Sequence, residues 1–205
     1  MAHHIYHTRG LILSSSPIGE SNRFYKIFTE ELGLVGASAQ AVREGKSKLR
    51  YSLQDFSWIY LDLVRGKEVW RITSAGECSK LDKTSEDNTK LSLLISDQEQ
   101  LKLFANVCSL VLRFVQGEGK DEKLFCDLLS LTLFLGRELI PLHLVSSFET
   151  LVQVRILAYL GYLDPKPYQE FLKSGDWSLN LLEEFENERS KANASINAAL
   201  YESHL

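Results

Sequence analysis

The sequence predicts an α+β fold, in which an all-β OB-fold barrel over residues 1–80 precedes an all-α helical bundle over residues 81–205. In the first region, short runs of branched and aromatic residues alternate with turns that contain glycine or proline, which predicts strands. In the second region, leucine and phenylalanine recur at three- and four-residue spacing, which predicts helices. Net charge follows the same division, since residues 1–80 carry +3 and the remainder −7. Two modules with different partners are therefore expected.

Five strands are predicted in the barrel region. They cover residues 8–14, 23–29, 34–41, 52–64 and 69–74. Gly33 is expected to end a hairpin turn, because glycine adopts a positive φ at low cost. A loop is expected at residues 14–19, because Pro17 and Gly19 interrupt a strand ladder. Five antiparallel strands of this size are typical of an OB-fold barrel, and an SH3-like barrel is also compatible with them.

The helical region begins with a capping motif. Ser96 and Glu99 have the S-x-x-E spacing of a capping box, which predicts a helix that runs to Gly117. Gly161 is expected to end a later helix, and Pro165 to block its continuation. The other helices are predicted over residues 121–139, 142–160, 168–173 and 180–201, and the sequence also allows a short one at residues 89–94.

The motifs of common enzyme classes are missing from the sequence. It contains no phosphate-binding glycine loop, no G-x-S-x-G elbow and no H-E-x-x-H pair. Cys78, Cys108 and Cys126 are far apart, which predicts neither a disulfide framework nor a zinc site. No apolar run approaches the roughly 20 residues of a membrane span, and no signal peptide is visible. We therefore expect a cytoplasmic binding protein with no catalytic residues, no cofactor and no membrane contact.

Residues 34–50 give the strongest functional signal. Their first half is small and apolar, as in a closely packed strand, and their second half is basic. The cations are Arg43, Lys46, Lys48 and Arg50, and only Glu44 opposes them. A strand that leads into a basic, glycine-containing loop is suited to a phosphate backbone. The same cations are also compatible with an ordinary solvated loop.

The predicted strand at residues 52–64 has two distinct faces. The residues expected inside the barrel are Ser57, Ile59, Leu61 and Leu63, and those expected outside are Phe56, Trp58, Tyr60 and Asp62. Exterior aromatic rings on such a barrel can stack on bases. They can also pack the barrel against a second domain, and we favour this interpretation because the helical region follows directly.

Several short motifs resemble the RecO family of bacterial recombination mediators. They are Tyr6-His-Thr-Arg-Gly10, Gly19-Glu20, Phe28-Thr-Glu-Glu-Leu-Gly33, Ala39-Gln40 with Ser47-Lys-Leu49, and Leu63-Val-Arg-Gly-Lys-Glu-Val-Trp-Arg71. Together they extend over residues 5–75. The helical region is similar in layout, with landmarks at Leu124-Phe125 and Leu160-Gly161-Tyr162. The resemblance implies an N-terminal OB-fold and a helical C-terminal domain.

The resemblance also implies a function. RecO-like proteins bind single- and double-stranded DNA, anneal complementary strands and, with RecR, help to load the recombinase onto DNA coated by single-stranded DNA-binding protein. The DNA contacts expected here are Arg43, Lys46, Lys48, Arg50, Arg23 and Lys67, with Arg9, Arg65 and Arg71 as weaker candidates. Many relatives carry a four-cysteine zinc motif after the Leu-Gly-Tyr landmark. No cysteine follows Gly161, so no metal is expected, and the chain also looks short in its last helices.

Two other functions are compatible with the sequence. In the first, the chain is a non-catalytic protein–protein scaffold whose acidic helical domain is the main binding surface. In the second, the barrel is an RNA-binding OB module. Salt dependence and competition between DNA and RNA would separate these classes.

Overall fold

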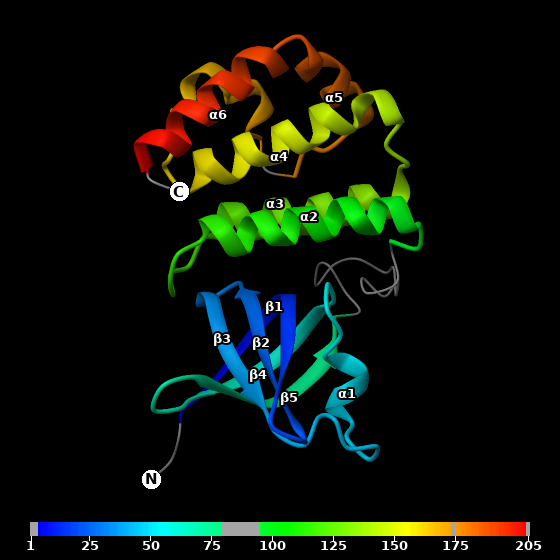
Figure 1. Cartoon of the computed structure of the whole chain (residues 1–205), viewed down its shortest axis with the longest axis vertical. Coiled ribbons are helices and arrows are strands. Elements are labelled where there is room, and N and C mark those ends of the chain that lie inside the picture. The colour runs from blue at the N-terminus through cyan, green and yellow to red at the C-terminus, as the bar shows by residue number, and fades with distance from the viewer. Residues whose placement is uncertain (1–3, 79–94, 174, 204–205) are drawn as a thin grey trace. The chain divides into compact units, whose positions relative to one another are not determined.

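The computed structural model describes residues 4–78, 95–173 and 175–203, and the chain divides into two compact units. The barrel unit consists of residues 1–94 together with residues 116–121. The helical unit consists of residues 95–115 and 122–205. Figure 1 shows five strands in the first unit and the long helices in the second. The domain boundary predicted between residues 80 and 81 lies outside the described residues.

The strands of the barrel unit close into a barrel in the order β1-β2-β3-β5-β4. They are β1 (Ile5–Ile18), β2 (Asn22–Thr29), β3 (Gly33–Ala39), β4 (Trp58–Arg65) and β5 (Trp70–Glu77), with the one-turn helix α1 (Leu49–Ser52) between β3 and β4. Strand β1 pairs with both β2 and β4, and β3 runs parallel to β5 where they meet. This arrangement confirms the predicted OB-fold architecture.

The loop predicted at residues 14–19 is wrong, because β1 continues through Pro17 to Ile18. Pro17 pairs with Arg23 of β2, whereas the pairing of β1 with β4 spans Ile5 to Leu11. Proline is tolerated where only one side of a strand is paired, because the N–H that it lacks can then be the one that would face the unpaired side. The register between β1 and β2 shifts between Ile12 and Ser14.

The long strand predicted at residues 52–64 is also wrong in its first part. Residues 49–52 form α1, and the strand begins only at Trp58. Phe56 has a φ of +67°, which is incompatible with an extended run. From Trp58 onward the predicted inward face is correct, since Ile59, Leu61 and Leu63 all belong to the barrel core.

Residues 116–121 form part of the barrel unit although they join two long helices. Glu118 bridges to Gly33, accepts a hydrogen bond from the Trp70 indole at 2.9 Å, and pairs with Arg65. Lys120 lies 3.3 Å from the Glu31 carboxylate. Burial raises the pKa of Glu118, but the hydrogen bonds from Arg65 and Trp70 outweigh this effect and hold the pKa below its ordinary value.

The elements of the helical unit are α2 (Gln98–Phe114), α3 (Glu122–Arg137), η2 (Leu142–Leu144), α4 (Val145–Tyr159), η3 (Lys166–Phe171), α5 (Leu179–Glu186) and α6 (Arg189–Ser203). The unit is arranged around α4, which packs against α2, α3, α5 and α6 and against the 3-10 helices η2 and η3. None of the described helices is long and apolar enough to cross a membrane.

The predicted helices of this unit need four corrections. The N-cap of α2 is Asp97, not Ser96, since its carboxylate accepts the backbone N–H groups of Glu99 and Gln100. The predicted helix at 142–160 starts with a 3-10 turn, and the one predicted at 168–173 is instead the 3-10 helix η3 (Lys166–Phe171), which is interrupted at Tyr168. The helix predicted at 180–201 is two helices, α5 and α6. Gly161 has the expected positive φ, +78°, after α4, and residues 89–94 lie outside the described part of the chain.

Candidate nucleic-acid interface

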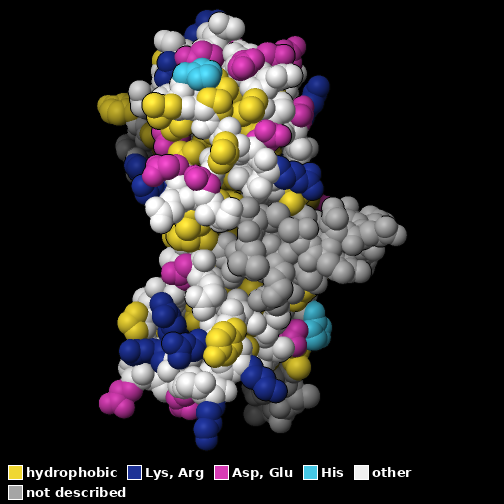
Figure 2. Space-filling view, turned by 90° about the vertical axis from the view of Figure 1, so that its right-hand side faces the viewer, with side chains coloured by type: hydrophobic (Ala, Val, Ile, Leu, Met, Phe, Trp, Pro, Cys, Tyr) yellow, Lys and Arg dark blue, Asp and Glu magenta, His cyan; other side chains and the backbone are white. Residues whose placement is uncertain are grey.

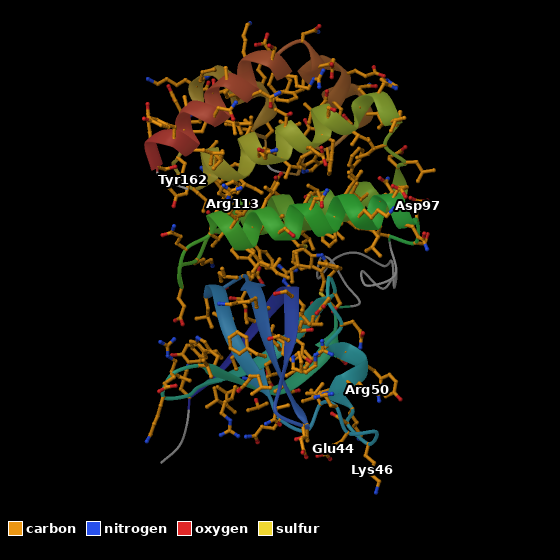
Figure 3. All side chains as sticks on the ribbon, viewed as in Figure 1. Glu44, Lys46, Arg50, Asp97, Arg113 and Tyr162 are labelled. Carbon is orange, nitrogen blue, oxygen red and sulfur yellow. The ribbon has the colours of Figure 1, made fainter. Side chains whose placement is uncertain are left out.

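The predicted basic stretch forms an exposed loop between β3 and β4. We call residues 41–55, which include α1, the basic loop. Its four cations, Arg43, Lys46, Lys48 and Arg50, are all exposed. Figure 2 faces the side of the barrel unit that carries α1 and shows Lys and Arg side chains gathered there. In Figure 3, Lys46 points away from the barrel and Arg50 lies on α1.

Hydrogen bonds of backbone and side chains hold the basic loop against residues 19–22, at the start of β2. The Asn22 side-chain oxygen accepts the Ala41 N–H at 3.0 Å, and the Ser21 carbonyl accepts the Arg43 N–H at 3.0 Å. The Arg43 side chain donates to the Gly19 carbonyl at 3.0 Å. Ala41, at the start of the loop, and Phe56, directly after its end, are the only non-glycine residues with positive φ in the described part of the chain. Such strained conformations often occur at functional sites.

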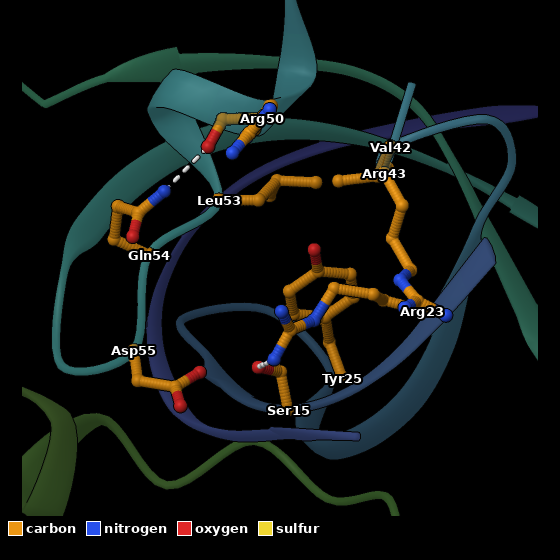
Figure 4. A pocket seen from close by; sticks show the side chains of 9 residues that line it. All are labelled: Ser15, Arg23, Tyr25, Val42, Arg43, Arg50, Leu53, Gln54 and Asp55. Carbon is orange, nitrogen blue, oxygen red and sulfur yellow. Dashed lines mark hydrogen bonds between the residues drawn. The ribbon is translucent and has the colours of Figure 1, made fainter. Parts of the chain in front are cut away.

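A cavity of about 630 Å³ lies between the basic loop and the first two strands. It is lined by Ser15, Arg23, Tyr25, Val42, Arg43, Arg50, Leu53, Gln54 and Asp55 (Figure 4). Arg23 shares the inward face of β2 with Tyr25 and Ile27, because alternate residues of a strand point the same way. Its Nη2 donates to the Ser15 hydroxyl at 2.7 Å. The cavity is thus a polar extension of the barrel interior.

Two polar atoms in this cavity are buried without a hydrogen-bond partner among the described residues. They are Nε of Arg23 and the hydroxyl of Tyr25. Burial raises the pKa of Tyr25, Asp55 raises it further, and Arg23 counteracts both. The phenol therefore keeps its proton at neutral pH and can donate a hydrogen bond.

The other predicted cations do not join this cluster. Lys67 lies in the β4–β5 turn, which Figure 1 shows on the opposite side of the barrel from α1. Arg9 makes two hydrogen bonds to Glu30, at 2.8 and 2.6 Å, which raise its pKa. Arg65 pairs with Glu118, and Arg71 donates to Gln40 at 3.3 Å. Of the predicted DNA contacts, Arg23, Arg43 and Arg50 therefore meet at one cavity, with Lys46 and Lys48 in the same loop.

The barrel that carries this cluster is also similar in sequence to known proteins. Residues 1–78 match the family model described as "Recombination protein O N terminal". This region is thus similar to the N-terminal part of recombination protein O.

Curated relatives described as DNA repair protein RecO extend the similarity beyond the barrel. The chain is 28% identical to the RecO protein of Clostridium novyi over 159 residues, which are 77% of this chain and 57% of the relative. It is 30% identical to the RecO protein of Dehalococcoides mccartyi over 128 residues, which are 62% of this chain and 46% of the relative. It is 29% identical to the RecO protein of Heliobacterium modesticaldum over 190 residues, which are 84% of this chain and 60% of the relative. The chain thus spans about half the length of these RecO relatives.

The aromatic side chains of this barrel differ in exposure. Trp58 is buried and Phe56 is half-buried, whereas Tyr60 is 45% exposed. A further aromatic residue, Tyr51, was not predicted as a site residue, yet it is 75% exposed on α1 beside Arg50. Its signal in the sequence is the tyrosine within Lys48-Leu-Arg-Tyr51, because aromatic residues interleaved with cations are typical of single-strand binding surfaces.

Proposed function

We propose that this chain is a RecO-like recombination mediator in DNA repair, which binds single- and double-stranded DNA through the basic loop of its barrel. The observation that supports this proposal most is the cluster of exposed cations on the loop. Other arginines of the same barrel, Arg9 and Arg65, are held by carboxylates of the barrel unit. In a chain with a net charge of −4, the basic loop therefore concentrates positive charge at one place.

The mechanism requires binding and no covalent chemistry. Cations of the loop neutralise phosphates on two complementary strands and so reduce the repulsion that slows annealing. Release of counterions from the DNA drives this binding. In the cytoplasm, a RecR-like partner and single-stranded DNA-binding protein would supply the remaining steps of recombinase loading. We propose no cofactor and no catalytic residue for this activity.

Binding of a fluorescent single-stranded oligonucleotide across a salt series tests the proposal. The variant replaces Arg43, Lys46, Lys48 and Arg50 by Ala. For single strands, the slope of log affinity against log salt is about −0.7 per neutralised phosphate, so the variant should lose up to about three units of slope. Its affinity should fall by at least about tenfold near physiological salt. Annealing of complementary strands should slow in parallel.

A matched control removes the same number of charges from the helical unit. The exposed residues Arg113, Lys123, Lys166 and Lys173 are replaced by Ala, and this variant should retain the affinity and most of the slope. Equal losses in both variants would show that net charge alone controls binding, which contradicts the basic-loop site. An unchanged basic-loop variant would place the DNA site elsewhere. If the wild-type chain fails to bind near physiological salt, the scaffold interpretation replaces the proposal.

A further inference from the structure

The cavity beside the basic loop has features that loose contact with a DNA backbone does not require. Three arginines and one aspartate line it, so its charge is positive. Its volume of about 630 Å³ lies within the range of small-molecule sites. Two apolar residues, Val42 and Leu53, line the same space and also belong to the barrel core. One side of the cavity is thus closed by the core.

Tyr25 is the strongest indication of a ligand. The residue is 0% exposed and belongs to the barrel core, yet its hydroxyl has no hydrogen-bond partner among the described residues. Figure 4 shows this hydroxyl within the ring of lining side chains. A buried hydroxyl is costly to leave unmatched. A protonated phenol can donate a hydrogen bond, so an acceptor atom of a ligand would satisfy this hydroxyl.

Arg23 adds a second buried donor. Its Nη2 is fixed by the hydroxyl of Ser15 at 2.7 Å, and its Nε has no hydrogen-bond partner in the described part of the chain. Arg43 and Arg50 line the same cavity from the basic loop. Several N–H and O–H donors with excess positive charge match an anion that offers several oxygens, and arginine is especially suited to phosphate.

We propose that this cavity binds the terminal phosphate of a DNA strand, with the end nucleotide against Val42 and Leu53. This inference rests on the proposed DNA binding and specifies the ligand of one part of that surface. A terminal phosphate is a monoester that carries about −1.5 to −2 charges at pH 7, which matches three arginines opposed by Asp55 better than the single charge of an internal phosphodiester. The closed side also favours an end, because the core residues Val42 and Leu53 block continuation of a strand on that side.

The test compares oligonucleotides of one sequence that carry an internal fluorophore. Their ends are a 5′-phosphate, a 3′-phosphate, or hydroxyls only. We expect the full chain to bind one of the phosphorylated forms about tenfold more tightly than the hydroxyl form, as charge-assisted hydrogen bonds to arginine allow. The ratio of the two dissociation constants is the readout. Contacts of the basic loop with internal phosphates affect both forms equally and cancel in this ratio.

Three variants of the cavity and one control assign the effect to residues. Tyr25→Phe removes only the hydroxyl and should reduce the ratio to about threefold, and Arg23→Gln should bring it close to one. Asp55→Asn removes the opposing charge and should increase the ratio. The control is Lys26→Gln on the same strand, because Lys26 is exposed and faces the other way; it should leave the ratio unchanged. Circular dichroism checks that each variant folds.

The outcomes separate this inference from the proposed function. If the oligonucleotides bind with a ratio near one, the terminal-phosphate site is refuted and DNA binding stands. If cavity variants and Lys26→Gln change the ratio equally, the site is also refuted. If no oligonucleotide binds, inorganic phosphate and a deoxynucleoside monophosphate are tested by thermal shift. Stabilisation of the wild type but not of Tyr25→Phe would then support a site for a free phosphate monoester, whereas no stabilisation would refute the site.

Discussion

A buried ion pair in the helical unit gives the sharpest stability prediction. Arg155 on α4 is 0% exposed, and its Nη1 lies 2.5 Å from the carboxylate of Asp127 on α3. The guanidinium also donates to the carbonyl oxygens of Phe171 and Asp176, at 2.7 and 2.8 Å. It lies 4.2 Å from the ring of Trp177, whose indole N–H donates to Asp127 at 3.1 Å. This single arginine therefore ties the segment between η3 and α5 to the two helices.

Asp127→Asn should strongly destabilise the helical unit. The amide keeps an oxygen for Trp177 and Arg155, but it leaves the buried guanidinium without a counter-charge. Removing one partner of a buried pair costs about 3–5 kcal/mol. A domain of this size is stable by about 5–15 kcal/mol, so the variant should lose a large part of its free energy of unfolding.

Urea unfolding followed by far-ultraviolet circular dichroism measures this loss, because all described helices longer than one turn lie in the helical unit. The matched control is Glu183→Gln on α5, an exposed charge that should change the free energy of unfolding by less than about 0.5 kcal/mol. A loss of less than about 1 kcal/mol in Asp127→Asn would refute the reasoning. Such a small loss would mean that hydrogen bonds to the carbonyl oxygens of Phe171 and Asp176 are enough to stabilise the buried Arg155 guanidinium without a carboxylate.

Three further predictions concern the barrel unit. Tyr51→Ala should weaken single-strand binding by about 1–3 kcal/mol without a change in salt slope, whereas Tyr201→Ala, 85% exposed on α6, should not. Gly33→Ala should lower the free energy of unfolding in urea by at least about 2 kcal/mol more than Gly19→Ala. Both glycines have positive φ, but a Cβ at Gly33 would lie 2.1 Å from the Gly119 oxygen, whereas a Cβ at Gly19 would contact nothing within 4 Å. Glu118→Gln should destabilise the barrel at pH 7 by no more than about 1 kcal/mol, since the pair with Arg65 is partly exposed. Because the pKa of Glu118 is lowered on folding, this difference should shrink as pH falls below the ordinary pKa of glutamate and vanish below the lowered pKa of the folded state. A loss that grows toward acid pH would contradict it.

Local patterns predicted most of the fold, and they failed where a single backbone conformation decided the outcome. The barrel and its inward face followed from alternation, which is confirmed at Ile59 and Leu61. The segment before Trp58 also contains alternating residues, but Phe56 takes a positive φ that no propensity scale indicates for an aromatic residue. The continuation of β1 through Pro17 depends on pairing with one strand only. Such pairing is a property of the closed barrel and is invisible in the local sequence.

The candidate site was predictable only in part. The cluster of charges in the basic loop is visible in the sequence, whereas the cavity requires β1, β2 and the loop to meet. One signal was nevertheless present. Arg23 shares its register with Tyr25 and Ile27, so a strand with Tyr25 and Ile27 inside must also place Arg23 inside. An arginine on an inward face needs a partner or a ligand. The same reasoning applies to Asp127, which lies on the apolar stripe of α3 between Leu124 and Leu131.

The two proposed parts of the DNA site should respond differently to salt. Lys46 and Lys48 are exposed, so salt screens their attraction to phosphates, and overall affinity should fall steeply. The hydroxyl of Tyr25 and Nε of Arg23 are buried, so their contacts to a terminal phosphate are screened much less. The preference for a phosphorylated end should therefore persist at salt concentrations that remove most of the affinity for internal segments. A preference that falls in proportion to overall affinity would instead mean that the end phosphate is bound by the exposed loop and not by the cavity.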